Sequence, residues 1–184
     1  MARLVILGGS GAGKSTQAKL LAEHLRIPAI STGEMLRSEI AAGSDLGEQA
    51  KKFVGSGELV PDDVVINFIR SNLSQADPDL GWVLEGYPRT AFQAEELDFL
   101  LDDLHHPLDW AIYLDVPDHL LRDRSIGRGE IDDSPASIDR RIELFIDLNK
   151  TLLDYYDHKN RLLTIDGSQS AELVCAQIQQ GIGQ

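Results

Sequence analysis

One loop constrains the fold more than any other stretch of this chain: Gly8-Gly9-Ser10-Gly11-Ala12-Gly13-Lys14-Ser15. It matches the pattern G-x-x-x-x-G-K-[ST], in which glycines let backbone N–H groups surround phosphate oxygens. The apolar run Leu4–Leu7 precedes it and predicts a strand buried on both faces. Apolar residues recur with helical spacing over 17–25. The loop therefore lies between a strand and a helix, which predicts a phosphate-binding loop rather than an ordinary turn.

Besides its backbone N–H groups, this loop has other features that would bind a phosphate group. The N-terminus of the following helix adds partial positive charge. Lys14 supplies a mobile cation, and the Ser15 hydroxyl is placed to lie near a Mg²⁺ ion that accompanies nucleotide phosphates.

The composition limits the partners of the chain. A length of 184 residues with 42% hydrophobic residues is typical of one domain. The net charge of −13 disfavours general binding to nucleic acid or to an anionic membrane. Apolar runs stay well short of a membrane span, and Cys175 stands alone in an apolar helical segment, which predicts a buried structural thiol. We expect a monomer in the cytoplasm.

Strand-like and helical segments alternate, which favours a parallel sheet flanked by helices. The expected strands are Leu4–Leu7, Ala29–Ser31, Trp82–Glu85, Trp110–Leu114 and Leu162–Ile165. Three helical segments lie between the second and third strands, at Gly33–Ala42, Leu46–Gly55 and Asp62–Leu73. They are too many for one crossover, so we expect a lobe beside the sheet.

A glycine-rich, charged stretch at 127–134 separates two further helices, Asp118–Ile126 and Pro135–His158. It is typical of either a plain helix connection or a lid over an active site. Arginines gather around it although the protein is acidic: Arg122, Arg124, Arg128, Arg140 and Arg141. In a lid they would deliver positive charge to a phosphate, whereas on a solvated helix face they would be unremarkable.

Polar residues also follow the second strand. Thr32 either caps the next helix or contacts a ligand. Arg37, one turn later, either faces the carboxyl edge of the sheet, where ligands bind in this fold class, or pairs with Glu34 on the surface.

The third strand ends in a second candidate run. Glu85 stands where an acid reaches a phosphate-bound Mg²⁺ directly or through water. Gly86 permits close approach of a ligand or another backbone. Pro88 then places Arg89 at a helix start, where a cation is unfavourable unless an anion lies in front of it.

These motifs together resemble adenylate kinase, in its short-lid form, over nearly the whole chain. The resemblance implies a P-loop NTPase-type α/β fold with a parallel five-stranded sheet, a helical monophosphate-binding lobe at 31–60 and a short lid at 127–134. It implies reversible phosphoryl transfer from Mg·ATP to AMP, giving two ADP.

The resemblance also implies roles for individual residues. ATP would be bound by Gly11, Ala12, Gly13, Lys14, Ser15, Thr16, Arg128 and Gly167. AMP would be bound by Thr32, Arg37, Glu58, Leu59, Val60, Gly86, Tyr87, Pro88, Arg89, Gln93 and Arg141. Catalysis would rest on Lys14, Arg89, Arg124, Arg128 and Arg141, with Ser15 and Glu85 near Mg²⁺.

The sequence departs from the family pattern at four positions. Ser10 replaces a proline, Ser15 replaces a glycine and Glu85 replaces an aspartate. The fourth change lies in the lid, where Glu130 stands in place of an arginine that faces the phosphoryl group. We expect Glu130 either to oppose the transferring charge or to turn away and pair with Arg128 or Arg140.

Three alternatives remain open at this point. The chain is a kinase for another nucleoside monophosphate, a nucleotide-binding protein whose chemistry Glu130 has weakened, or an ATPase whose short lid seals poorly. Thr32 and the run from Pro88 to Gln93 favour AMP among the monophosphates.

Overall fold

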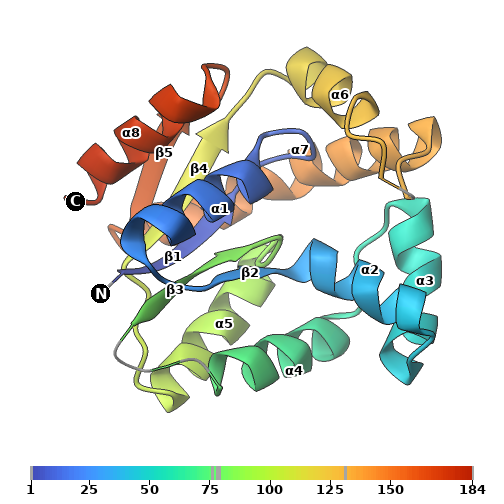
Figure 1. The fold of residues 1–184 in the computed structure, drawn as a ribbon, viewed down its shortest axis with the longest axis horizontal. Coiled ribbons are helices and arrows are strands. Elements are labelled where there is room, and N and C mark those ends of the chain that lie inside the picture. The colour runs from blue at the N-terminus through green and yellow to red at the C-terminus, as the bar shows by residue number, and fades with distance from the viewer. Residues whose placement is uncertain (1, 76, 78–79, 131, 184) are drawn as a thin grey trace.

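The computed structural model describes residues 2–75, 77, 80–130 and 132–183. Its centre is a sheet in which five described strands run parallel in the order β2-β3-β1-β4-β5 (Figure 1). The strands are β1 (Ala2–Leu7), β2 (Ala29–Ser31), β3 (Gly81–Glu85), β4 (Trp110–Asp115) and β5 (Leu162–Asp166). The predicted parallel sheet is confirmed.

Helices cover both faces of this sheet. They are α1 (Lys14–Leu25), α2 (Thr32–Ala42), α3 (Asp45–Ser56), α4 (Asp62–Leu73), α5 (Ala91–Asp103), α6 (Asp118–Ile126), α7 (Pro135–His158) and α8 (Ala171–Gly181). One face packs against α1 and α8, and the other against α4, α5 and the C-terminal part of α7.

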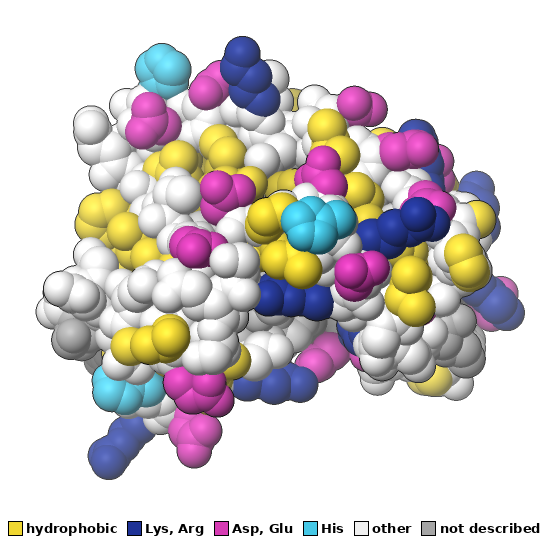
Figure 2. Space-filling view, turned by 90° about the horizontal axis from the view of Figure 1, so that it is seen from above, with side chains coloured by type: hydrophobic (Ala, Val, Ile, Leu, Met, Phe, Trp, Pro, Cys, Tyr) yellow, Lys and Arg dark blue, Asp and Glu magenta, His cyan; other side chains and the backbone are white. Residues whose placement is uncertain are grey.

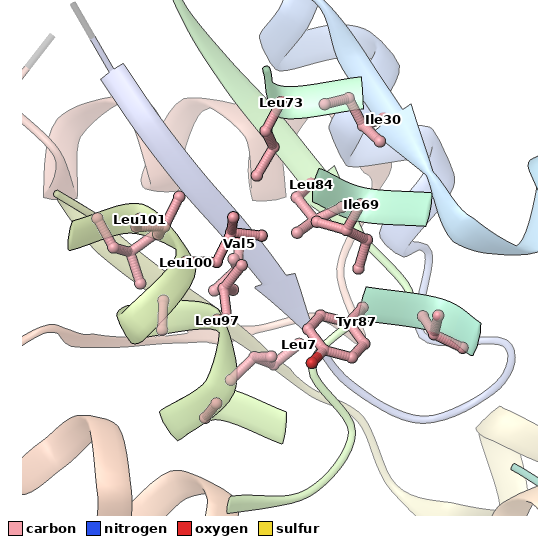
Figure 3. Close-up of a cluster of buried hydrophobic side chains, with 14 of the residues drawn as sticks. Val5, Leu7, Ile30, Ile69, Leu73, Leu84, Tyr87, Leu97, Leu100 and Leu101 are labelled. Atoms are coloured by element: carbon pink, nitrogen blue, oxygen red, sulfur yellow. The ribbon is translucent and has the colours of Figure 1, made fainter. Parts of the chain in front are cut away.

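The alternation of side chains along β1 explains these two layers. Leu4 and Ile6 point into the cluster that contains Leu21 of α1, while Val5 points into the opposite cluster with Leu97 of α5 (Figure 3). Because helices cover both faces, β1 is apolar at every position from Leu4 to Leu7 rather than at alternate ones. Each fully buried aliphatic side chain contributes about 1.5–3 kcal/mol through removal from water. This packing fixes β1, and with it the loop that follows.

Helices α2 and α3 lie beside the sheet, where the sequence predicted a lobe (Figure 1). The two helices pack closely, since a Cβ added at Gly47 would stand 2.2 Å from the backbone oxygen of Glu39. Helix α7 contacts the C-terminal part of α3, since Arg141 of α7 donates to the Val54 carbonyl over 3.2 Å. Gly57, just after α3, would place a Cβ 2.4 Å from the Ser137 oxygen of α7. Ile131, within the expected lid 127–134, lies outside the described residues.

Other features of the fold bear on possible partners. Cys175 is buried, as the sequence predicted. No helix formed by the described residues is long and apolar enough to cross a membrane. On the face drawn in Figure 2, basic, acidic and hydrophobic side chains are interspersed.

Candidate active site

A cavity of about 520 Å³ opens at the carboxyl ends of the strands. It lies between the loop after β1, the helices α2 and α3, the loop after β3, and the α6–α7 region. All the residues to which the family resemblance assigns a binding, catalytic or Mg²⁺-related role line the cavity, whereas Arg122, Glu130 and Arg140 do not. The lining residues with such a role are Gly11, Ala12, Gly13, Lys14, Ser15, Thr16, Thr32, Arg37, Glu58, Leu59, Val60, Glu85, Gly86, Tyr87, Pro88, Arg89, Gln93, Arg124, Arg128, Arg141 and Gly167.

The glycine-rich loop turns into α1 at the floor of this cavity. Gly13 has φ 93°, in the left-handed region that favours glycine, and Lys14 is the first residue of α1. Lys14 Nζ donates to the Gly9 carbonyl over 2.8 Å, across the loop. Burial lowers the pKa of Lys14 from 10.5 to about 8, against the opposing effect of Glu85. The negative charge of Glu85 is therefore too weak to offset the burial of the Lys14 ammonium group. This incomplete compensation suits the loop to binding an anionic ligand.

Nearby cations add to this effect. Arg89, Arg128 and Arg141 all lower the pKa of Lys14 through charge repulsion. Burial, together with the charges of Arg141 and Arg128, likewise lowers the pKa of the Arg89 guanidinium. A polyanion bound between these cations would offset their mutual repulsion and accept hydrogen bonds from them.

A carboxylate and two hydroxyls meet beside Lys14. Glu85, at the end of β3, is buried and accepts hydrogen bonds from Ser15 Oγ over 3.0 Å and from Ser31 Oγ. These oxygens fit Mg²⁺, a hard cation that takes one or two carboxylates and keeps several waters. No cluster of three or more His, Cys, Asp or Glu side chains suited to a metal occurs among the residues that the structure describes. Any Mg²⁺ here would therefore depend on phosphate and water for its remaining ligands.

The start of α2 differs in one detail from the sequence expectation. Ser31, not Thr32, caps the helix, because its Oγ accepts from the Glu34 N–H. Thr32 is one residue inside the helix, where its side chain is buried and donates to the Glu85 carbonyl over 3.3 Å. Gly86 makes this contact possible, since a Cβ there would stand 2.2 Å from Thr32 Oγ1.

The loop after β3 is held by its own hydrogen bonds. Thr90 caps α5, so Arg89 lies just before the helix rather than in it. Arg89 Nε donates to the Gly86 carbonyl over 2.9 Å, and the Arg89 N–H donates to Gln93 Oε1 over 2.7 Å. Gln93 Nε2 in turn donates to Asp62 Oδ1 over 2.6 Å. Both ends of the Gln93 amide therefore have protein partners.

Arg124 reaches toward the loop after β5. Its guanidinium donates to the carbonyls of Gly167 over 2.9 Å and Ser168 over 3.0 Å. Arg124 thus fixes the position of the Gly167 loop at the edge of the cavity.

Two acids in the connection between α6 and α7, Asp132 and Asp133, bind the remaining arginines of the cavity. Arg128 donates to both carboxylate oxygens of Asp133, over 2.8 and 2.5 Å, and Arg141 donates to the same carboxylate over 2.8 Å. Arg141 also donates to Asp132 Oδ2 over 2.5 Å and to the Val54 carbonyl over 3.2 Å. Burial would raise the pKa of Asp133, but its hydrogen bonds from Arg128 and Arg141 lower that pKa overall. Neither Asp132 nor Asp133 was predicted as a site residue from the sequence, although both lie in the charged stretch 127–134.

Two ion pairs that the sequence had left open as alternatives do not form. Arg37 does not pair with Glu34, because Glu34 Oε1 accepts from Lys19 Nζ over 2.7 Å. Glu130 does not pair with Arg128 or Arg140, because Arg140 Nε donates to Glu58 Oε1 over 2.6 Å and Arg128 is bound to Asp133.

Instead, Arg37, which lines the cavity, lies next to Glu130, which does not line it. Arg37 Nε lies 3.6 Å from Glu130 Oε2, and Arg37 Nη1 lies 3.9 Å from Asp132 Oδ1. The connection between α6 and α7 therefore meets helix α2 through these side chains.

Further cavity residues escaped the sequence analysis. They belong mainly to α7 and to the segment around α8: Leu144, Phe145, Leu148, Asn149, Leu152, Gln169, Ala171 and Val174. Their helical spacing in α7 was a visible signal, but that spacing equally fits core packing.

A P-loop at the end of a central parallel strand, with arginines converging from several other segments, defines a nucleotide-binding phosphotransferase. The comparisons with known proteins identify the family. The adenylate kinase family model matches residues 6–161. A Nostoc protein named adenylate kinase 2 is 58% identical over 96% of each chain. Two Synechocystis proteins follow: adenylate kinase 2, 49% identical over 94% of this chain and 95% of its own, and adenylate kinase 1, 41% identical over 96% and 95%. The chain belongs to the adenylate kinase family, as its motifs predicted.

Proposed function

We propose that the chain transfers a phosphoryl group reversibly from Mg·ATP to AMP, giving two ADP. The observation that carries this proposal is the convergence of Lys14, Arg89 and Arg141 on one cavity that both the P-loop and the α2–α3 lobe line. Two anionic substrates would bind from opposite sides of this cationic centre. The relatives named adenylate kinase support the same reaction.

Each side of the cavity has a part in the proposed reaction. The loop amides, Lys14 and Thr16 hold the ATP phosphates, and the Gly167 loop, fixed by Arg124, borders the site of the base. On the other side, Arg37 and Arg89 orient the AMP phosphate as the nucleophile, and Thr32 and Gln93 border its base. The segment Glu58, Leu59 and Val60 lines the same pocket.

The transfer itself requires alignment and charge neutralisation rather than covalent catalysis. Arg128 and Arg141 neutralise the transferring group, since Asp133 holds both guanidinium groups in one place. No general base is needed, because the AMP phosphate is already ionised near neutral pH. Mg²⁺, held near Ser15 and Glu85, would supply further charge neutralisation when bound. Closure of the lid excludes water and so protects ATP from hydrolysis.

Initial rates with AMP, CMP, UMP and GMP as acceptors test this proposal. AMP should be preferred, because Thr32 and Gln93 border the acceptor side of the cavity. A preference for any of the other three would reassign the acceptor while leaving the phosphotransferase class intact.

The other assignments from the sequence stay predictions. These are a monomer, a cytoplasmic location, and the absence of nucleic-acid and membrane partners. Analytical ultracentrifugation at micromolar concentration tests the first of them.

A further inference from the structure

Glu130 and Arg37 form an ion pair between two parts of the chain that are far apart in the sequence. Arg37 comes from α2 in the lobe, and Glu130 comes from the connection between α6 and α7. Arg37 Nε and Glu130 Oε2 are 3.6 Å apart, and the two side chains are 22% and 38% exposed. Arg37 lines the cavity on the side where it would hold the AMP phosphate, and Glu130 lies next to Arg37 without lining the cavity itself.

Three arginines in and near the connection between α6 and α7 have short, directed partners. Arg128 and Arg141 bind the Asp133 carboxylate at 2.5 to 2.8 Å, and Arg140 binds Glu58 at 2.6 Å. Within the described part of the chain, Arg37 forms only the two long ion pairs, to Glu130 and to Asp132 at 3.9 Å. Charge-assisted hydrogen bonds are usually 2.7–2.9 Å long. The two carboxylates therefore offset the charge of the Arg37 guanidinium, but they do not form short hydrogen bonds with its N–H groups.

A nucleotide phosphate would make better use of these donors. It carries nearly two negative charges and three acceptor oxygens, against the single charge of a carboxylate. Once it bound Arg37, the Glu130 carboxylate would lie beside it as a like charge. Glu130 thus opposes the phosphate twice, by occupying Arg37 beforehand and by repelling the phosphate afterwards.

We propose that Glu130 sets the affinity for AMP by competing with the AMP phosphate for Arg37. This inference rests on the proposed function, because it takes the ligand of Arg37 to be AMP. Removing the charge at residue 130 should tighten AMP binding and leave ATP binding unchanged. For a partly exposed ion pair, the expected gain is about two- to fivefold.

The test is calorimetric titration with AMP of the wild type, Glu130→Gln and a control, Glu143→Gln. Glu143 pairs with Arg140 at 3.5 Å and not with Arg37, so the control makes the same change in net charge without releasing Arg37. We expect Glu130→Gln to lower the AMP dissociation constant about two- to fivefold, and the control to leave it unchanged. The gain should shrink as salt is added. An unchanged or weaker affinity in Glu130→Gln would overturn the proposal.

A second comparison tests the role of Arg37. In an Arg37→Ala background, Glu130→Gln should no longer tighten AMP binding. An equal gain in that background would show general repulsion and overturn competition for Arg37. If wild type forms ADP from ATP and AMP while Glu130→Gln changes nothing, this inference fails and the proposed function stands. If wild type binds no AMP, both fail.

Discussion

Ser15 Oγ donates a hydrogen bond to Glu85 Oε1 over 3.0 Å, which links the phosphate-binding loop to the end of the neighbouring strand β3. Ser31 donates to the same oxygen from the end of β2. Three successive segments at one edge of the sheet thus converge on a single buried carboxylate. In the proposed function, this carboxylate and the Ser15 hydroxyl are the protein groups nearest to Mg²⁺.

Glu85→Gln should therefore raise the Mg²⁺ concentration needed for half-maximal activity. A loss of about 10–100-fold in apparent metal affinity is typical when a group that supports a metal site is changed. Titration of ADP formation with Mg²⁺ at fixed nucleotide measures this. Glu85→Asp, which keeps the charge, should lose less. An unchanged Mg²⁺ requirement in Glu85→Gln would place the metal elsewhere.

Lys14→Ala should reduce kcat by about 10²–10³, the usual cost of removing one preorganised charge contact. Lys14 is the cation at the centre of the loop, and its Nζ already points across that loop to the Gly9 carbonyl. The measurement is kcat at saturating ATP and AMP. Activity within a few-fold of wild type would show that another cation performs this role.

Lys14→Met should stabilise the protein in the absence of nucleotide at pH 7. The pKa of Lys14 is about 8 in the folded protein and near 10.5 in the unfolded chain. Between these values the unfolded chain binds more protons, so the contribution of Lys14 to the free energy of unfolding rises with pH. Below about pH 8, Lys14 is charged in both states, and burying this charge lowers the free energy of unfolding by about 1–3 kcal/mol after allowance for solvent screening.

Urea unfolding of wild type and Lys14→Met at pH 7 and pH 9.5 checks this linkage. The variant should be more stable at pH 7, and the difference should become smaller at pH 9.5. The loss of the lysine leaves the Gly9 carbonyl with a partner, because the Ala12 N–H also donates to it at 3.1 Å. A less stable variant at pH 7 would contradict the assigned direction of the pKa change.

Arg37→Ala and Arg89→Ala should each raise the KM for AMP by about tenfold or more, because a hydrogen bond to a charged group contributes about 1.5–3 kcal/mol. The KM for ATP should change little, since both arginines lie on segments other than the P-loop. Arg122→Ala is the matched control, because Arg122 pairs with exposed Asp139 and does not line the cavity. A change confined to the KM for ATP would refute the assignment.

Gly86→Ala should weaken both the fold and the acceptor side of the site. Gly86 has φ 87°, and an added Cβ would lie 2.2 Å from Thr32 Oγ1. The residue would be strained and would push Thr32 away from the Glu85 carbonyl. We expect about 1–3 kcal/mol of lost stability and a higher KM for AMP, measured by urea unfolding and steady-state kinetics. Wild-type values for both would show that the loop relaxes freely.

Local patterns in the sequence predicted the parallel sheet well, because each strand is a short apolar run bounded by glycine or polar residues. The P-loop was equally readable, since its spacing, its lysine and its neighbouring strand and helix agree. The helix cap of α2 was misplaced by one residue because Ser31 and Thr32 are both good caps. Only the tertiary fold directs Thr32 toward β3.

Ion pairs and hydrogen bonds between residues far apart in the chain could not be predicted from the sequence. Arg37 has an acidic neighbour at helical spacing, Glu34, yet that acid binds Lys19 and Arg37 meets Glu130 instead. Both choices depend on how α1, α2 and the lid lie relative to one another. The same holds for Arg124, whose partners Gly167 and Ser168 are backbone carbonyls that carry no sequence signal.

A coupled assay of ADP formation tests the central claim most directly. With Mg·ATP in excess, the wild type should form two ADP for each AMP consumed, should form no ADP when AMP is omitted, and should release no inorganic phosphate. Phosphate release without AMP, or binding of both nucleotides without formation of ADP, would contradict the account.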